Sequence, residues 1–201
     1  TLYHLIFIVK IKIIMKVSIL GSGLTSLTLA KMLVNQGINV DIFSNQKRLK
    51  DNKIQTLGIS KSNIDFFNKN ILNITKFLWD INKIEIFSEN FKNEKLLNFD
   101  NNNKVLFSII RNSNLYNHLF LNLKKSRLIN FKKKISYNNL VKKDYNLIFN
   151  CDYNDLITKK FFYKKINKNY NSFAYISTLK HKKILNNNIA SQIFTKNGPL
   201  A

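Results

Sequence analysis

Cysteine, histidine and long apolar runs are scarce in this 201-residue chain. The single cysteine, Cys151, excludes an internal disulfide framework and favours a reducing compartment. With three isolated histidines and one cysteine, the chain offers no metal-ligating set and no catalytic triad. Residues 1–14 are apolar, but Lys10 and Lys12 interrupt them well short of a bilayer span. We interpret that stretch as a leader or a misassigned start, ahead of a natural beginning at Met15.

Acidic residues are also few. The chain contains 11 Asp and Glu and 33 Lys and Arg, which gives a net charge of +22. Such a charge could indicate nucleic-acid binding. The lysines are scattered, however, as short clusters such as 132–134 among abundant Asn, Ile and Phe, the residues that an AT-rich genome over-uses. No helix-turn-helix, zinc-finger or aromatic RNA-binding signature accompanies them. We therefore expect no nucleic-acid partner and keep open a peripheral association with an anionic membrane.

Glycine occurs five times, and two of these residues, Gly21 and Gly23, are separated by one position. An apolar strand at 16–20 precedes them, an amphipathic helix closed by Gly37 follows, and a second strand occupies 38–43. This order predicts a βαβ unit with parallel strands and a right-handed crossover.

The turn between the first strand and the helix matches the start of a dinucleotide-binding fingerprint. The first glycine permits the bend, the second allows a pyrophosphate close to the backbone, and the third permits close packing of helix and strand. Small Ser26 stands at the third position. We favour a nucleotide cofactor at the helix N-terminus over a purely structural turn. The predicted cradle is Gly21, Ser22, Gly23, Leu24, Thr25 and Ser26.

The end of the second strand should carry an acidic residue for the adenosine ribose. Ser44 occupies that position, and Asp41 lies three residues earlier, within the strand. Ser44 could make one hydrogen bond in place of a bidentate carboxylate contact.

Further elements follow from periodicity. Helices are predicted at 60–70 and 113–125, the second with a stripe of Leu115, Leu119 and Leu123. Strands at 83–89 and 104–110 should form an antiparallel ribbon around a turn at 98–103. A short buried strand is expected at 146–152 and another strand at 172–178. The fold class is therefore α/β, a Rossmann-like parallel sheet with an inserted antiparallel ribbon.

Four further segments resemble the flavin-dependent hydroxylases of ubiquinone biosynthesis. The stretch from Gln55 to Ser60 resembles the family's Arg-Thr-x-Ala-Leu-Ser segment, with Gln55 where the family's arginine would approach the flavin nucleotide. Asn112 and Leu115 match its Val-Glu-Asn-x-x-Leu helix entry. Asp152 matches the aspartate of an Ala-Asp-Gly motif, with Tyr153 in place of the glycine. Residues 193–201, IFTKNGPLA, match a Phe-Thr-x-x-Gly-Pro-Leu-Ala segment almost residue for residue.

The resemblance implies an enzyme that binds FAD and uses NAD(P)H as co-substrate. Reduced flavin would react with oxygen, and the aromatic ring of a polyprenyl phenol would be hydroxylated. It also implies a cytoplasmic protein, peripheral to the inner membrane or free, with a ubiquinone-biosynthesis complex as a candidate partner. The cofactor-binding set then comprises the cradle together with Ser44, Gln55 and Asp152. No catalytic residue and no metal ligand is predicted.

The same resemblance divides the chain into an FAD-binding domain at 15–160 and the truncated beginning of a substrate-domain sheet at 161–201. The inserted ribbon at about 80–110 would belong to the substrate domain. We expect this N-terminal fragment to be inactive alone and to expose Phe173, Tyr175, Ile193 and Phe194. Two alternatives remain: a non-catalytic or degenerate nucleotide-binding module, and an NAD-dependent dehydrogenase, which the inserted ribbon and the Gly198-Pro199 segment disfavour.

Overall fold

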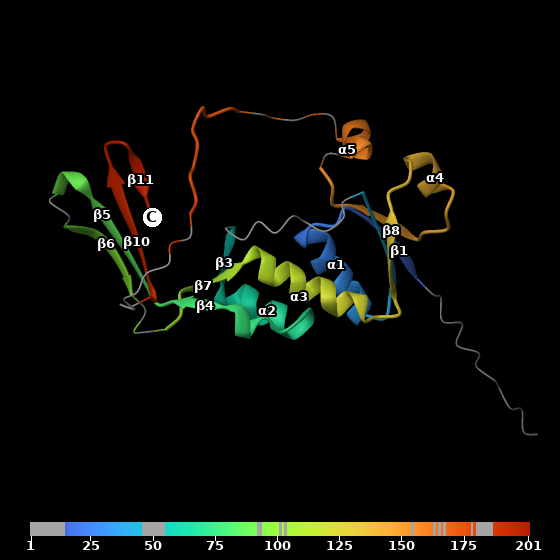
Figure 1. The fold of residues 1–201 in the computed structure, drawn as a ribbon, viewed down its shortest axis with the longest axis horizontal. Helices are drawn as coiled ribbons and strands as arrows, with labels where there is room; N and C mark the ends of the chain where they lie inside the picture. The colour runs from blue at the N-terminus through green and yellow to red at the C-terminus, as the bar shows by residue number, and fades with distance from the viewer. Residues whose placement is uncertain are drawn as a thin grey trace, which may run out of the picture.

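A computed structural model describes residues 15–45, 55–91, 94–100, 102, 104–153, 155–162, 164, 166, 168–177, 179 and 187–201. Residues 1–14, which we interpreted from the sequence as a leader or a misassigned start, lie outside these residues. The described chain is mixed α/β, with one parallel sheet and two sheets that contain antiparallel pairs. Its strands and helices are arranged as Figure 1 shows.

The parallel sheet has the order β8-β2-β1-β9, formed by Ile129–Lys133, Asn39–Ser44, Lys16–Leu20 and Leu147–Asn150. All three of its pairings are parallel. Helix α1, Leu24–Asn35, connects β1 to β2 and confirms the predicted βαβ unit. Gly37 ends the turn after this helix with a φ of 77° and donates its N–H to the Val34 carbonyl.

The main apolar core lies between this sheet and two helices, α1 and α3 (Asn112–Lys124). Val17 and Ile19 of β1 point into this core, whereas Ser18 and Leu20 point to the other face of the sheet. All four are buried, so both faces of β1 are covered. The predicted leucine stripe is confirmed, because Leu115, Leu119 and Leu123 are all buried. On the opposite face, Leu20, Phe43 and Leu140 form a second cluster beside the short helix α4 (Tyr137–Val141).

A second sheet extends the same core. Its strands are antiparallel, in the order β3-β7-β4: Thr56–Ser60, Phe107–Arg111 and Trp79–Ile81. Ile110 of β7 is fully buried and belongs to the cluster that contains α1 and α3. The second sheet therefore shares an apolar core with α1, α3 and the parallel sheet.

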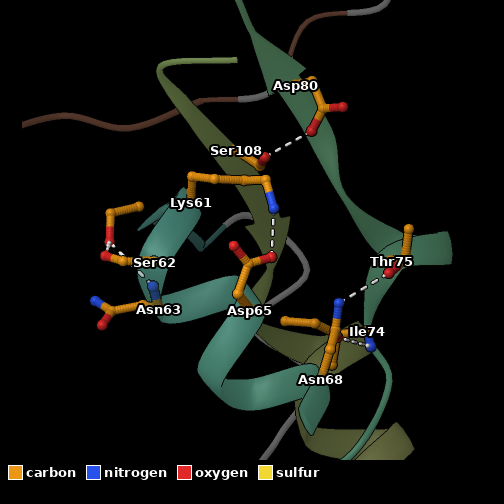
Figure 2. A network of polar contacts seen from close by, with 10 residues as sticks. Lys61, Ser62, Asn63, Asp65, Asn68, Ile74, Thr75, Asp80 and Ser108 are labelled. Carbon is orange, nitrogen blue, oxygen red and sulfur yellow. Dashed lines mark hydrogen bonds and ion pairs between the residues drawn. The ribbon is translucent and has the colours of Figure 1, made fainter. Parts of the chain in front are cut away.

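Figure 2 shows the polar contacts around helix α2, Lys61–Asn70: those of its first turn, those with the turn that follows it, and the contact between strands β7 and β4. Ser60 caps the helix by accepting the Asn63 N–H. Beyond it, Asn68 accepts the Ile74 N–H at 2.9 Å, just ahead of the 3₁₀ turn Thr75–Phe77. Buried Ser108 donates to Asp80 at 2.6 Å and ties β7 to β4. These bonds fix the connection from α2 to β4.

The third sheet stands at the far end of the molecule from α4 and β8 in Figure 1. It has the order β11-β10-β5-β6: Gly198–Leu200, Ile189–Thr195, Lys83–Ser88 and Lys95–Asp100. The central β5–β10 pair is parallel, and the two outer pairs are antiparallel. The IFTKNGPLA segment forms the β10–β11 hairpin. A 3₁₀ turn, Glu89–Phe91, and helix α5, Leu156–Phe161, complete the described elements.

Three details of the predicted secondary structure are wrong. Strand β5 pairs with β6, which includes part of the predicted turn, whereas β7 joins the second sheet. Strand β9 is half exposed instead of buried, because it lies at the edge of the parallel sheet. Residues 172–177 form no strand, and Thr178 lies outside the described residues.

Of the four side chains expected to be exposed, three are: Phe173, Tyr175 and Phe194. Ile193 is half-buried, because its side chain lies on the opposite face of β10 from that of Phe194.

Candidate nucleotide-binding site

The turn from β1 to α1 requires glycine at its first position. Gly21 has a φ of 103°, a conformation that L side chains rarely adopt. A Cβ there would lie 3.2 Å from the Ser26 hydroxyl and 3.3 Å from the Cys151 backbone carbon. The Gly21 N–H donates to the Phe43 carbonyl at 2.9 Å, so the turn is also fixed to the end of β2. Both the backbone conformation and the packing therefore exclude a side chain at Gly21.

Gly23 is needed for a different reason. It is the N-cap of α1 with an ordinary φ of −75°, and no described atom would lie within 4 Å of a Cβ at this position. No side chain caps the helix, and its first turn contains no acidic residue. The first N–H groups and the positive end of the helix dipole are thus available to an anion. The absence of a side chain leaves space for that anion against the backbone.

Ser26 takes the place of the third glycine. It is fully buried, and its hydroxyl lies behind Gly21 and beside the Cys151 thiol. Burial raises the pKa of that thiol, and the Ser26 hydroxyl opposes the shift only in part. Cys151 therefore stays protonated at neutral pH, which fits a packing role better than a nucleophilic one.

Five predicted site residues line one pocket of about 400 Å³: Gly21, Ser22, Gly23, Ser44 and Asp152. They come from three places in the sequence, and the parallel order of β2, β1 and β9 brings the carboxyl ends of these strands to one edge. Four more described residues line the pocket and were not predicted: Asn45, Lys134, Cys151 and Tyr153.

Lys134 is the only lysine or arginine among the described residues that line this pocket, and carboxylates already surround it. Its ammonium lies 2.7 Å from Asp155 and 3.6 Å from Asp152. The hydrogen bond to Asp155 raises the pKa of Lys134 despite its partial burial. Burial would raise the pKa of Asp155, but the bonds from Lys134 and from the Ile157 N–H outweigh it, and the pKa is lowered. Asp155 also caps α5, so this ion pair fixes the segment that carries Asp152.

Ser44 lies where the ribose-binding carboxylate was expected. Its hydroxyl is 2.8 Å from the Ser22 hydroxyl, so the two form a polar bridge across the mouth of the turn. Asp41 cannot take over the missing role, since it is buried on the face that contains Phe43.

The Asp41 carboxylate is already engaged by its neighbours. Lys132, Asn130 and Tyr145 donate to it at 2.7, 2.9 and 2.5 Å. Burial would raise the pKa of Asp41, but these hydrogen bonds outweigh it, so the pKa lies below the ordinary value. Burial and the Asp41 carboxylate in turn raise the pKa of the Tyr145 hydroxyl. This buried network is structural.

Four predicted residues do not line the pocket over the glycines: Ser26, which is buried behind Gly21, and Leu24, Thr25 and Gln55. Leu24 and Thr25 line a separate apolar groove of about 480 Å³ between α1 and α2, together with Leu57 and Phe66. Gln55 lies at the start of β3, where its carbonyl accepts the Asn112 N–H at 2.9 Å and its side chain accepts the Asn112 amide at 3.4 Å. The structure thus pairs two residues of the family resemblance with each other.

Lys134 was not predicted as a site residue, although the sequence contains a pattern that could have identified it. It follows β8, a strand that we did not predict because its second half reads Phe-Lys-Lys. Placing that strand beside β2 would have brought Lys134 to the same edge as Ser44. The Lys134 N–H in fact donates to the Ser44 carbonyl at 3.3 Å.

Comparison with known proteins gives the fold. No protein-family model matches this chain, and no curated protein matches it. Among solved structures, p-nitrophenol 4-monooxygenase PnpA of Pseudomonas putida DLL-E4 aligns at a TM-score of 0.50 and 14% identity, over 60% of this chain and 32% of that one. The matched part of our chain shares the fold of this monooxygenase.

Two other similar structures are PqsL of Pseudomonas aeruginosa, a probable FAD-dependent monooxygenase, and 2-methyl-3-hydroxypyridine-5-carboxylic acid oxygenase. They align at a TM-score of 0.49, with 16% and 14% identity, over 59% of this chain. Our chain covers 32% and 31% of their lengths. The chain thus spans about a third of the length of the structures that it matches.

Two negative observations concern the described residues alone. None of their helices is long and apolar enough to cross a membrane. They also contain no group of three or more His, Cys, Asp or Glu that could hold a metal ion.

Proposed function

We propose that this chain is the nucleotide-binding part of an FAD-dependent aromatic hydroxylase. The observation that carries the proposal is the β1–α1 turn, in which strained Gly21 and open Gly23 lie at the edge of a pocket in a monooxygenase fold. The residues present fit the pyrophosphate of FAD, because uncapped N–H groups face a space that any side chain at Gly23 would fill.

The chain's own residues would bind and orient the cofactor. The N–H groups of the first turn of α1 would hold the pyrophosphate, and the Ser22–Ser44 hydroxyl pair would contact the ribose. Lys134, anchored by Asp155, would donate a hydrogen bond to the phosphates. When bound, flavin supplies the redox and oxygen chemistry, which explains why no acid–base pair is predicted from the sequence.

We infer that the substrate is a polyprenyl phenol and that NAD(P)H is the reductant. The support is the series of segments that resemble the ubiquinone-biosynthesis hydroxylases, above all residues 193–201. In the structure those residues form the β10–β11 hairpin, on a sheet separate from the nucleotide-binding pocket. A separate sheet is a suitable place for substrate contacts. Peripheral attachment to a membrane and a biosynthetic complex are further parts of this proposal.

A flavin-binding experiment tests the proposal directly. The longest reading frame that contains this chain would be purified, incubated with FAD, freed of excess ligand by gel filtration, and examined for flavin absorbance and for quenching of flavin fluorescence. Retained FAD in the wild type and its loss in Gly23→Val would support the assignment. The longest reading frame that contains this chain would then be assayed for hydroxylated phenol and for NAD(P)H oxidation.

The competing candidate is a non-catalytic nucleotide-binding module. The departure at Ser44 favours it, because the ribose carboxylate of flavoproteins is missing. Binding of adenosine diphosphate without binding of FAD, together with no flavin-dependent product, would make this module the better account.

A further inference from the structure

Tyr153 is the one aromatic side chain among the described residues that line the pocket over the glycines. It directly follows Asp152, in the segment between β9 and α5. Its side chain is 75% exposed. Among the residues that the structure describes, this side chain takes part in no hydrogen bond, ion pair or ring contact. The fold thus holds a large side chain at the rim of the pocket without using it for its own stability.

The backbone around Tyr153 is fixed by hydrogen bonds. The Asp152 N–H donates to the Asn150 side chain at 3.0 Å. The Asp152 carbonyl accepts from the Asp155 N–H at 3.0 Å and from the Thr158 hydroxyl at 3.1 Å. Asp155 is buried and caps α5. These contacts keep the Cα of Tyr153 at the rim of the pocket, whereas no contact with a described residue prevents its side chain from turning toward a ligand.

The side chains of this pocket supply no net positive charge for a pyrophosphate. Lys134 and Asp152 are the only charged residues among the described residues that line it, and their charges cancel. They lie 3.6 Å apart, and Lys134 is also bonded to Asp155 at 2.7 Å. A phosphate at this edge of the sheet must therefore be bound largely by neutral N–H and O–H donors. The first turn of α1 offers N–H groups, and Tyr153 offers an O–H group.

A tyrosine is chemically suited to this position. A phenol O–H donates one hydrogen bond, and such a bond is stronger to a charged phosphate oxygen than to a neutral acceptor. The ring would also cover the ligand and exclude water, which strengthens the hydrogen bonds beneath it. Ser44 lacks the carboxylate that would bind the ribose, so a contact from Tyr153 would compensate for affinity that is lost at the adenosine end.

We propose that Tyr153 binds the pyrophosphate of the bound cofactor. Its O–H would donate to a phosphate oxygen, and its ring would close the mouth of the pocket that contains Gly21 and Gly23. The inference rests on the proposed function, in which FAD occupies this pocket. It assigns Tyr153 the task of retaining the cofactor, so the rate of FAD release depends on this side chain.

Chemical protection of the phenol tests this inference without an assay of activity. The longest reading frame that contains this chain would be treated with N-acetylimidazole, which acetylates exposed tyrosine hydroxyls, in the presence and absence of FAD. Mass spectrometry of the peptides gives the acetylation rate of each tyrosine. Tyr170 is the internal control, because it is 74% exposed and is not among the residues that line the pocket. We expect FAD to slow acetylation of Tyr153 and to leave that of Tyr170 unchanged.

Two variants separate the hydroxyl from the ring. Tyr153→Phe should raise the dissociation constant for FAD about tenfold, because it removes one hydrogen bond to a charged group. Tyr153→Gly also removes the ring, so it should raise the constant further and accelerate FAD release, whereas the control Tyr170→Phe should bind as the wild type does. Without FAD, all three should melt at the wild-type temperature, since both side chains are exposed. Wild-type affinity in Tyr153→Gly, or weaker binding that merely accompanies a lower melting temperature, would overturn the inference.

Adenosine diphosphate separates this inference from the proposed function, because it contains the pyrophosphate but no flavin. Protection of Tyr153 by adenosine diphosphate, without any binding of FAD, would overturn the proposed function and leave the pyrophosphate contact standing. Retention of FAD with Tyr153 acetylated as fast as in the free protein would overturn this inference alone. If neither nucleotide binds, both are overturned.

Discussion

The hydroxyls of Ser22 and Ser44 lie 2.8 Å apart and join the turn after β1 to the end of β2. A carboxylate at position 44 would face the uncapped helix terminus and accept bonds from a ligand. Ser44 instead makes a hydrogen bond to Ser22 within the protein and carries no charge. The charge of the site then comes from other side chains, such as Lys134. In the function that we propose, this pair would contact the ribose without a carboxylate.

The two glycines of the turn should respond differently to substitution. Gly23→Ala should lower the free energy of unfolding by less than about 1 kcal/mol, because alanine is a poorer N-cap than glycine but nothing lies near the new Cβ. Gly21→Ala should destabilise the protein by about 1–3 kcal/mol, because of its positive φ and its contacts with Ser26 and Cys151. Urea denaturation followed by circular dichroism measures both. Equal destabilisation would show that the turn is not built as described.

Leu119→Ala should cost about 2–5 kcal/mol of unfolding free energy, because the side chain is fully buried in the main core. Leu121→Ala is the matched control on the same helix: its side chain is 51% exposed, so the cost should be below about 0.5 kcal/mol. Chemical denaturation of both variants provides the comparison. A similar loss in the two would contradict the orientation of α3.

Asp41→Asn should destabilise the protein by about 3 kcal/mol, because it leaves Lys132 facing a neutral group in a largely buried network. Asp65→Asn removes an ion pair of the same type with Lys61, but this pair is exposed on α2 and should contribute less than about 0.5 kcal/mol. Thermal melts at neutral pH would rank the two. If Asp65→Asn proved the more damaging, the burial of Asp41 would be disproved.

Acid should destabilise the protein through Asp41 and Asp155, whose pKa values are below the ordinary range in the folded state. A lowered pKa adds stability that is complete above the unfolded-state pKa of about 3.9 and is lost as the pH falls through the folded-state value. The melting temperature should therefore drop steadily below about pH 4. In Asp41→Asn that drop should be shallower. An unchanged slope would remove Asp41 from this account.

The sequence predicted the βαβ unit well because its signals are local. The apolar strand at 16–20, the positive-φ requirement at Gly21 and the terminating Gly37 lie within one continuous segment. The leucine stripe of α3 is equally local, since its residues recur with the period of a helix.

Strand pairing is where the sequence was insufficient. The pattern around Lys83–Ser88 predicts a strand, but its partner depends on packing and on chain segments far away. Strand β8 was missed because its lysines interrupt the apolar pattern, although exposed lysines are normal at the edge of a sheet. Lys134 of the candidate site was missed with it, since Lys134 comes beside Ser44 only once β8 is placed next to β2.

The order β11-β10-β5-β6 has a consequence for synthesis on the ribosome. The Trp79 indole donates to the Asn187 carbonyl, 108 residues later, next to the start of the β5–β10 pairing. Chain growth is slow compared with the formation of a hairpin, so β5 and β6 would pair long before β10 is translated. During that interval the edge of β5 that β10 later covers stays unpaired in the nascent chain. Protection of that edge by chaperones would then matter most during translation of the segment between Asp100 and Ile189.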